Sequence, residues 1–285
     1  MTPTLVRQHV AHADPAHADP APRVDLGARA RDWSEIQERM LVPLYEAVYD
    51  RLGVGPGSRL LGLRCGSGLA LLLAASRGAA VTGVDSAFPE RLALARARLR
   101  PGSPPGGRRA RGAPHLLDGP PAAPADGEPY TLVTVFEPGD ADGLGELLAA
   151  VLPLAAPGAA VVLAGWGPPE RCATASVLRV AAGPAGPLPG ANGWRPARRD
   201  DLEEAAARAG LRPDGSGRVA CPFGYADLDS AVRGLLSTGL FDAALAATDA
   251  RQVDKELTEA LHPHRRPDGT VWMPNVFRYL VARVP

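Results

Sequence analysis

A glycine turn and an acid about one helix further along the chain are the residues best suited to hold a ligand. Cys65, Gly66, Ser67 and Gly68 follow a short apolar run, and Asp85 ends a second apolar run about 17 residues past the last glycine. Glycines let the backbone approach a ligand closely where a helix begins, and an acid at the next strand end can accept both hydroxyls of a ribose. The pattern predicts a strand–turn–helix–strand unit that binds a nucleoside cofactor.

The same residues also have structural explanations. Gly66 and Gly68 could simply form the turn between strand and helix, and Asp85 could be a solvated acid at a strand end. Ser86 could lie near an adenine or ribose, or it could cap the following helix. The sequence leaves these alternatives open.

Acid–base candidates lie further along the chain. Glu137 follows the apolar run 130–136, at the strand end where sheets of this kind bind ligands, although it could also be a surface acid. His262 and His264 lie in the segment HPHRRPDG and titrate in the range of a general base. A solvated turn is the simpler explanation of the two histidines. We treat all three as weak catalytic candidates.

Two aromatic residues are candidates for the wall of a substrate pocket. Trp166 comes just after the apolar run 159–163, and Tyr225 precedes a helical stretch. Trp33 lies on an N-terminal helix, where it could pack in the core or cover a ligand.

The hydrophobic pattern around the glycine turn predicts the elements that position these residues. Strands alternate with helices, which indicates five parallel strands and their crossover helices. The predicted strands are 60–63, 80–84, 113–117, 130–136, 159–163, 211–221 and 270–284, and the predicted helices are 33–52, 91–99, 144–152, 171–182, 199–209, 226–236 and 241–261. Ser34 begins a capping-box pattern, so we expect the first helix to start there. The fold class is an α/β, doubly wound, mostly parallel sheet.

Composition excludes several classes of function. The chain of 285 residues carries 31 basic and 31 acidic residues, so a nucleic-acid partner is not expected. Three cysteines without a CxxC pair predict a reducing, cytoplasmic location and no cysteine metal site. The sequence has no signal-peptide pattern and no apolar stretch long enough to cross a membrane.

Domain organisation follows from the low-complexity start of the chain. Residues 1–27 contain the repeat AHADP-AHADP and are expected to form a disordered leader, although its histidines and aspartates could bind a metal. Residues 28–285 are expected to form one domain. Helix 33–52 and inserts at about 168–193 and 226–262 should form a helical cap.

In these features the chain resembles the class I S-adenosylmethionine-dependent methyltransferases over roughly residues 30–285. The resemblance rests on Cys65–Gly68, on Gly83-Val84-Asp85-Ser86, on the strand 131–136 and on the order of elements. It implies a seven-stranded sheet with a reversed final strand and methyl transfer to a small-molecule acceptor, with S-adenosylhomocysteine as the product. Carried onto this sequence, the cofactor-binding residues are Arg64, Cys65, Gly66, Ser67, Gly68, Asp85, Ser86 and Glu137.

The chain departs from the family pattern at three positions. Gly62 replaces the usual acid of the first motif, Arg64 replaces its first glycine, and Ala113 stands near the position of the acid that binds adenine. Arg64 could bind the carboxylate of the cofactor, or it could turn away while Glu137 or another acid supplies negative charge. The alternative function is a protein that has lost cofactor binding or methyl transfer and instead binds a metabolite or a protein.

Overall fold

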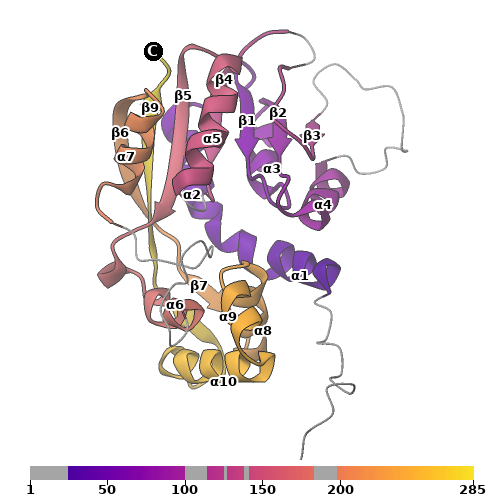
Figure 1. The fold of residues 1–285 in the computed structure, drawn as a ribbon, viewed down its shortest axis with the longest axis vertical. Coiled ribbons are helices and arrows are strands. Elements are labelled where there is room, and N and C mark those ends of the chain that lie inside the picture. Colours follow the sequence, from indigo (N-terminus) through magenta and orange to yellow (C-terminus); the bar gives the residue numbers. More distant parts are fainter. Residues whose placement is uncertain (1–24, 100–113, 125–126, 138–140, 183–197) are drawn as a thin grey trace, which may run out of the picture.

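The sheet has seven strands in the order β3-β2-β1-β4-β5-β9-β6 (Figure 1). The computed structural model describes residues 25–99, 114–124, 127–137, 141–182 and 198–285, so Ala113 and the leader up to residue 24 lie outside it. The strands are β1 (Arg59–Leu63), β2 (Ala80–Val84), β3 (His115–Leu117), β4 (Tyr130–Val135), β5 (Ala155–Trp166), β6 (Arg212–Ala220), β7 (Phe223–Tyr225), β8 (Val271–Met273) and β9 (Val276–Arg283). The first five strands of the order are parallel, and β9 runs antiparallel to both its neighbours. The predicted fold class is confirmed.

Helices cover both faces of this sheet (Figure 1). They are α1 (Leu26–Asp32), α2 (Val42–Leu52), α3 (Leu69–Ser76), α4 (Pro89–Leu99), α5 (Ala141–Val151), α6 (Thr174–Ala182), α7 (Asp201–Arg208), α8 (Leu228–Ser237), α9 (Asp242–Ala247) and α10 (Ala250–Leu261). Side chains of α2, α3 and α4 share one apolar core with one face of the sheet, and those of α5 and α7 share a second core with the other face.

The central strands are apolar on both faces because helices cover both sides. Leu60 belongs to the first core and its neighbour Leu61 to the second, as expected when successive strand side chains point to opposite faces. Both side chains are completely buried. This arrangement explains the nearly continuous apolar runs that identified the parallel strands in the sequence.

A second group of helices lies beyond the carboxyl ends of the parallel strands (Figure 1). Helix α10 contacts α6, α8 and α9, and the small sheet of β7 and β8 packs beside them. Helix α1 contacts both α4 and α8, so the N-terminal segment lies between the sheet and this helical layer.

The N-terminal helical segment differs from its prediction. Helix α1 starts at Leu26, where the Asp25 side chain accepts a hydrogen bond from the Ala28 amide at 2.9 Å. The chain then passes through a π-helical turn, Trp33–Gln37, and a 3-10 turn, Glu38–Leu41, before α2 begins. The expected start at Ser34 is therefore wrong, because Asp25, nine residues upstream, caps a helix that begins before Ser34.

Two long predicted elements are each interrupted. The helix predicted at 241–261 divides into α9 and α10, where the Asp249 side chain caps α10 by accepting from the Arg251 amide at 3.2 Å. The strand predicted at 270–284 divides into β8 and β9 around the buried Asn275. The Asn275 side chain accepts from the Thr174 amide at 3.1 Å and donates to the Met273 carbonyl at 3.2 Å.

Two further features concern the described parts of the chain. None of their helices is long and apolar enough to cross a membrane. Within the same residues, no group of three or more histidine, cysteine, aspartate and glutamate side chains is placed to hold a metal ion.

The packing of α3 on the sheet depends on a glycine in β2. A Cβ at Gly83 would lie 2.4 Å from Leu71 Cδ1, 2.6 Å from Leu116 Cδ2 and 2.9 Å from Cys65 Sγ. We predict that Gly83→Ala lowers the free energy of unfolding by about 1–3 kcal/mol, because three side chains must shift. Urea denaturation measures this difference.

Gly145 in α5 provides the matched control, since an added Cβ there meets nothing within 4 Å. Gly145→Ala should raise stability by about 0.5–1 kcal/mol, because alanine favours the helix. Equal effects of the two substitutions would contradict the crowding seen at Gly83.

Candidate functional site

The carboxyl ends of β1, β2 and β4 bring three of the predicted site residues to one edge of the sheet. Leu63 of β1 pairs with Val84 of β2 and with Val135 of β4. Arg64, Asp85 and Glu137 follow these strand ends, Arg64 and Asp85 directly and Glu137 after one intervening residue. This edge is where open α/β sheets bind ligands.

Asp85 is bonded to the glycine turn and to the start of the next helix. Its Oδ2 accepts from the Gly66 amide at 3.0 Å, and its Oδ1 accepts from the amides of Ala87 at 3.1 Å and Phe88 at 3.3 Å. The side chain is only 3 % exposed. Burial raises the pKa of Asp85, and these three amides and Arg91 oppose that increase. The carboxylate thus fixes the turn, which explains why an acid is needed here even without a ligand.

Glu38, from the N-terminal segment, is buried against the same turn. One of its oxygens accepts from the Ser67 hydroxyl and from Arg98 Nη1 at 2.7 Å, and the other accepts from the Leu69 amide at 3.2 Å. The carboxylate therefore caps α3, whose first amides have no partner within the helix. Only 2 % of Glu38 is exposed.

Trp33 and Arg91 close the edge beside Glu38. The guanidinium of Arg91 lies 4.0 Å from the Trp33 ring centroid and 4.1 Å from that of Phe88. A Cβ on Gly66 would lie 3.1 Å from the indole nitrogen of Trp33. That nitrogen is buried and has no hydrogen-bond partner among the described residues. The Trp33 ring thus packs against the turn that was predicted to face a cofactor, and Arg91 stacks on this ring and on that of Phe88.

Glu137 lies close to the guanidinium of Arg91. One of its oxygens lies 3.7 Å from Arg91 Nη1. Burial raises the pKa of Glu137 to about 8, Arg91 and Arg64 oppose this increase, and the charges of Glu38 and Asp85 add to it. The pKa of Glu137 is therefore raised toward neutral pH, and the 31 % exposure of its side chain moderates this increase.

Arg64 and Gly62 show how the first motif has changed. Arg64 is the one non-glycine residue with a positive φ among the described residues, at 50°, and such a conformation costs about 1–2 kcal/mol for an L-residue. A Cβ at Gly62 would lie 2.8 Å from Leu71 Cδ2. The position therefore has no room for the acid of the family pattern unless Leu71 moves.

A small cavity of about 20 Å³ remains at this edge. Its lining residues are Glu38, Tyr45, Gly62, Leu63, Arg64, Cys65, Ala70, Leu71, Thr134, Phe136 and Glu137. The cavity has space for about one water molecule. Small-molecule sites generally have volumes of about 300–1,000 Å³, so this edge is closed in the described conformation.

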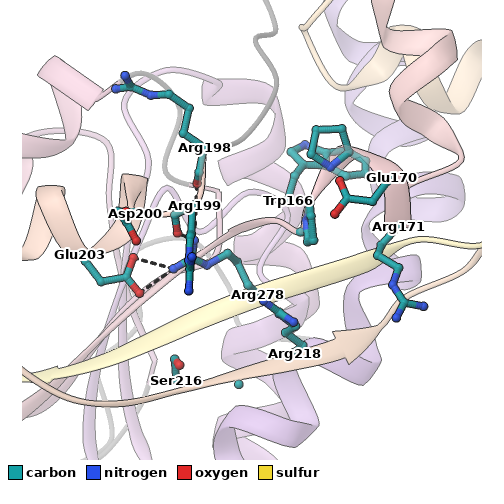
Figure 2. A pocket seen from close by; sticks show the side chains of 14 residues that line it. Trp166, Glu170, Arg171, Arg198, Arg199, Asp200, Glu203, Ser216, Arg218 and Arg278 are labelled. Atoms are coloured by element: carbon teal, nitrogen blue, oxygen red, sulfur yellow. Dashed lines mark hydrogen bonds and ion pairs between the residues drawn. The ribbon is translucent and has the colours of Figure 1, made fainter.

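A much larger hollow, of about 780 Å³, lies at the other half of the sheet edge (Figure 2). Its lining residues are Trp166, Gly167, Pro168, Pro169, Glu170, Arg171, Arg198, Arg199, Asp200, Glu203, Ser216, Gly217, Arg218 and Arg278. Trp166, a predicted substrate-pocket residue, lies at one wall and packs on Phe277 with ring centroids 4.6 Å apart.

The other predicted site residues lie elsewhere. Tyr225 is buried and donates its hydroxyl to Gln37 at 2.9 Å, so it does not line either cavity. Ser86 is exposed, and α4 begins at Pro89, which places Phe88 rather than Ser86 at the capping position. His262 and His264 form a 3-10 turn after α10 and line neither cavity.

Sequence reasoning missed Glu38, Arg91 and Arg98. The spacing held one signal for Glu38, because it shares a helical face with the buried Leu41 and Tyr45 at positions i+3 and i+7. An acid on an apolar face needs a buried partner. The sequence could not identify this partner, because Ser67 and Arg98 are 29 and 60 residues away.

Glu137 makes stability depend on pH. Its pKa of about 8 in the folded protein exceeds its ordinary value of 4.5, so the folded state binds more protons between these values and stability falls as pH rises through this window. We predict that Glu137→Gln exceeds the parent protein in stability by about 1 kcal/mol or more at pH 9 but not at pH 4. Urea midpoints at both pH values measure this, with the exposed Glu146→Gln on α5 as control. Parallel pH profiles for parent and Glu137→Gln would contradict the raised pKa.

Comparison with known proteins supports the fold. No protein-family model and no curated protein sequence matches the chain. Among solved structures, similarity extends to YjhP of E. coli (19 % identity, TM-score 0.51, 90 % of this chain and 99 % of that one). It extends equally to a candidate methyltransferase of Bacillus halodurans (13 %, 0.53, 84 % and 98 %). A chain of the Haloferax volcanii complex between the Trm112 methyltransferase activator and a candidate methyltransferase is also similar (20 %, 0.51, 92 % and 98 %). The chain therefore has the fold of the class I S-adenosylmethionine-dependent methyltransferases.

Proposed function

We propose that the protein transfers a methyl group from S-adenosylmethionine to a small-molecule acceptor. The observation that carries the proposal is the glycine turn with its buried acid, Asp85, at the carboxyl edge of β1 and β2 in a sheet of the methyltransferase fold. When bound, the cofactor supplies an electrophilic methyl group, so the protein mainly has to bind and orient the reactants.

The chemistry of the side chains at this edge suits that cofactor. S-adenosylmethionine presents two ribose hydroxyls, a sulfonium, an ammonium and a carboxylate. Asp85 can accept hydrogen bonds from the hydroxyls. Glu38 and Glu137 can pair with the positive groups, and Arg64 can pair with the carboxylate. Glu38 thereby contributes a negative charge at the turn that Gly62 no longer supplies.

The space between these side chains is too small for the cofactor as it stands. Because the cavity measures only about 20 Å³, an adenosine group can enter only after the segment Trp33–Leu41 moves away from the glycine turn. That segment is the irregular π-helical and 3-10 part of the N-terminal helices. Irregular helical turns of this kind often mark functional sites and hinges.

Glu137 is our candidate for handling a proton. Its pKa is raised while Arg91 is its nearest cation, and a further positive charge beside it would lower that pKa and favour the ionised carboxylate. The ionised carboxylate could then accept a proton from an acceptor hydroxyl or amine.

The helical layer beyond the sheet edge is our proposed cap over the acceptor. Trp166 and the large hollow lie at this edge, and the hollow has the volume of a small-molecule site. The balanced net charge favours a small molecule over nucleic acid as the acceptor. Three buried free thiols suit a reducing compartment, and we place the activity in the cytoplasm.

The second candidate function is a methyltransferase-fold protein that binds a metabolite or a protein without using the cofactor. The closed edge favours this second function. The Ser67 hydroxyl is already bonded to Glu38, and Trp33 fills the space beside Gly66. The two functions differ in whether the purified protein binds S-adenosylmethionine.

Calorimetric titration with S-adenosylmethionine and S-adenosylhomocysteine tests the proposed function. We expect micromolar binding of the former, weakened about tenfold to a hundredfold by Asp85→Asn, which removes the charge that accepts the ribose hydroxyls. The asparagine keeps one acceptor for the turn, and near-ultraviolet circular dichroism checks that the variant remains folded. No binding by the folded parent protein would favour the second function.

Because Trp33 fills the space beside Gly66, its removal should affect cofactor binding. Replacing Trp33 by alanine should tighten S-adenosylmethionine binding about tenfold, because it favours the open conformation that binds. Trp272→Ala, on β8, is the matched control, since Trp272 is 39 % exposed and lines neither cavity. Weaker binding by Trp33→Ala alone would mean that Trp33 holds the cofactor rather than excludes it.

A further inference from the structure

We propose that the hollow beside Trp166 binds the carboxylate or phosphate group of an anionic small molecule. This inference deepens the proposed function, since it makes the acceptor anionic, but the binding itself does not depend on the cofactor. The hollow is lined by five arginines and three carboxylates, which leaves an excess of two positive charges.

The arginines differ in how far they are neutralised. Arg278 is held by both oxygens of Glu203, at 2.5 and 2.6 Å, and also donates to the Arg199 carbonyl (Figure 2). Arg198 pairs with Asp201 at 3.2 Å. Within the described ranges, Arg171, Arg199 and Arg218 have no ion pair, so their charges remain available to a ligand.

The walls of the hollow come from rigid elements. Arg278 and Arg218 are paired with each other across β9 and β6, and Trp166 pairs with Phe277 across β5 and β9. The two hydrogen bonds from Arg278 Nη2 to Glu203 tie the start of α7 to this sheet. Trp166, Arg218 and Arg278 are thus held on paired strands before any ligand arrives, which lowers the entropic cost of binding. Arg171 lies in the 3-10 turn Pro169–Arg171, and Arg199 lies in the turn before α7.

The shape and chemistry favour an organic anion over a simple ion. Trp166 is partly exposed at the wall opposite Glu203, so its ring can contact an apolar part of a ligand while the arginines bind its anionic group (Figure 2). Guanidinium groups bind carboxylate and phosphate with two parallel hydrogen bonds. A cationic ligand would meet net repulsion here.

The hollow also lies where an acceptor is needed. Trp166 ends β5, which pairs with β4, and Glu137 follows β4 at the same edge of the sheet. An acceptor whose anionic group occupied the hollow would therefore extend its other end along the edge toward the proposed cofactor position.

The test titrates the folded, full-length protein with inorganic phosphate and follows the indole N–H resonance of Trp166 by NMR, assigned with Trp166→Phe. We expect a saturable shift at millimolar phosphate that chloride at equal ionic strength does not produce. Replacing both Arg199 and Arg218 by glutamine should raise the apparent dissociation constant at least about tenfold, since two of the three arginines without an ion pair among the described residues then lose their charge.

Arg212→Gln is the matched control, because Arg212 lies on the same strand about 20 Å from Arg218 at 3.3 Å per residue. It should leave the titration unchanged. A shift that does not saturate, that chloride reproduces, or that the double variant retains would overturn the proposal. None of these results depends on S-adenosylmethionine, so failure here would leave the proposed function intact, and failure of cofactor binding would leave this site intact.

Discussion

The buried carboxylate of Glu38 is the interaction on which the arrangement of the sheet edge depends. A charge that is 2 % exposed must be paired, and its partners are the Ser67 hydroxyl, the Leu69 amide and Arg98. Removing any one partner would leave a buried polar group unsatisfied. The contact therefore holds the N-terminal segment against the glycine turn, and the segment brings Trp33 onto the guanidinium of Arg91, which lies on α4.

This closure determines the chemistry at the edge. Burial at this edge raises the pKa values of Asp85 and Glu137, and the charge of Arg91 opposes both increases. The structure thus combines two features that pull in different directions: acids and arginines that suit a charged cofactor, and a packing that leaves space for about one water molecule. In our proposal, movement of the segment Trp33–Leu41 opens this edge to the cofactor.

The two halves of the sheet edge are built differently. At the ends of β1, β2 and β4 the polar side chains bond to one another and leave almost no empty volume. At β5, β9 and β6 a fixed ion pair of Arg278 with Glu203 keeps the strands and α7 together while other arginines face the hollow. The first half is organised to hold itself closed, and the second is open to solvent and positively charged. A ligand that spans both halves would have to displace packed side chains at one end, and at its other end it would enter an open, positively charged hollow.

The sequence by itself determined the sheet and the turn. Local periodicity, glycine positions and apolar runs depend on neighbours within a few residues, which is why the parallel strands were predictable and why Asp85 was placed at a strand end. The reversed final strand was expected from the family resemblance. The sequence also placed Trp166 just past its predicted fifth strand, and the structure extends β5 to include it. The breaks at Asp249 and Asn275 and the early start at Asp25 depended on side-chain caps that a periodic pattern does not reveal. Only the tertiary structure decided that Glu38 meets Ser67 and Arg98, that Arg91 stacks on Trp33, and that five arginines surround one hollow. These contacts join residues far apart in the chain, and their energies depend on burial, which no local spacing specifies.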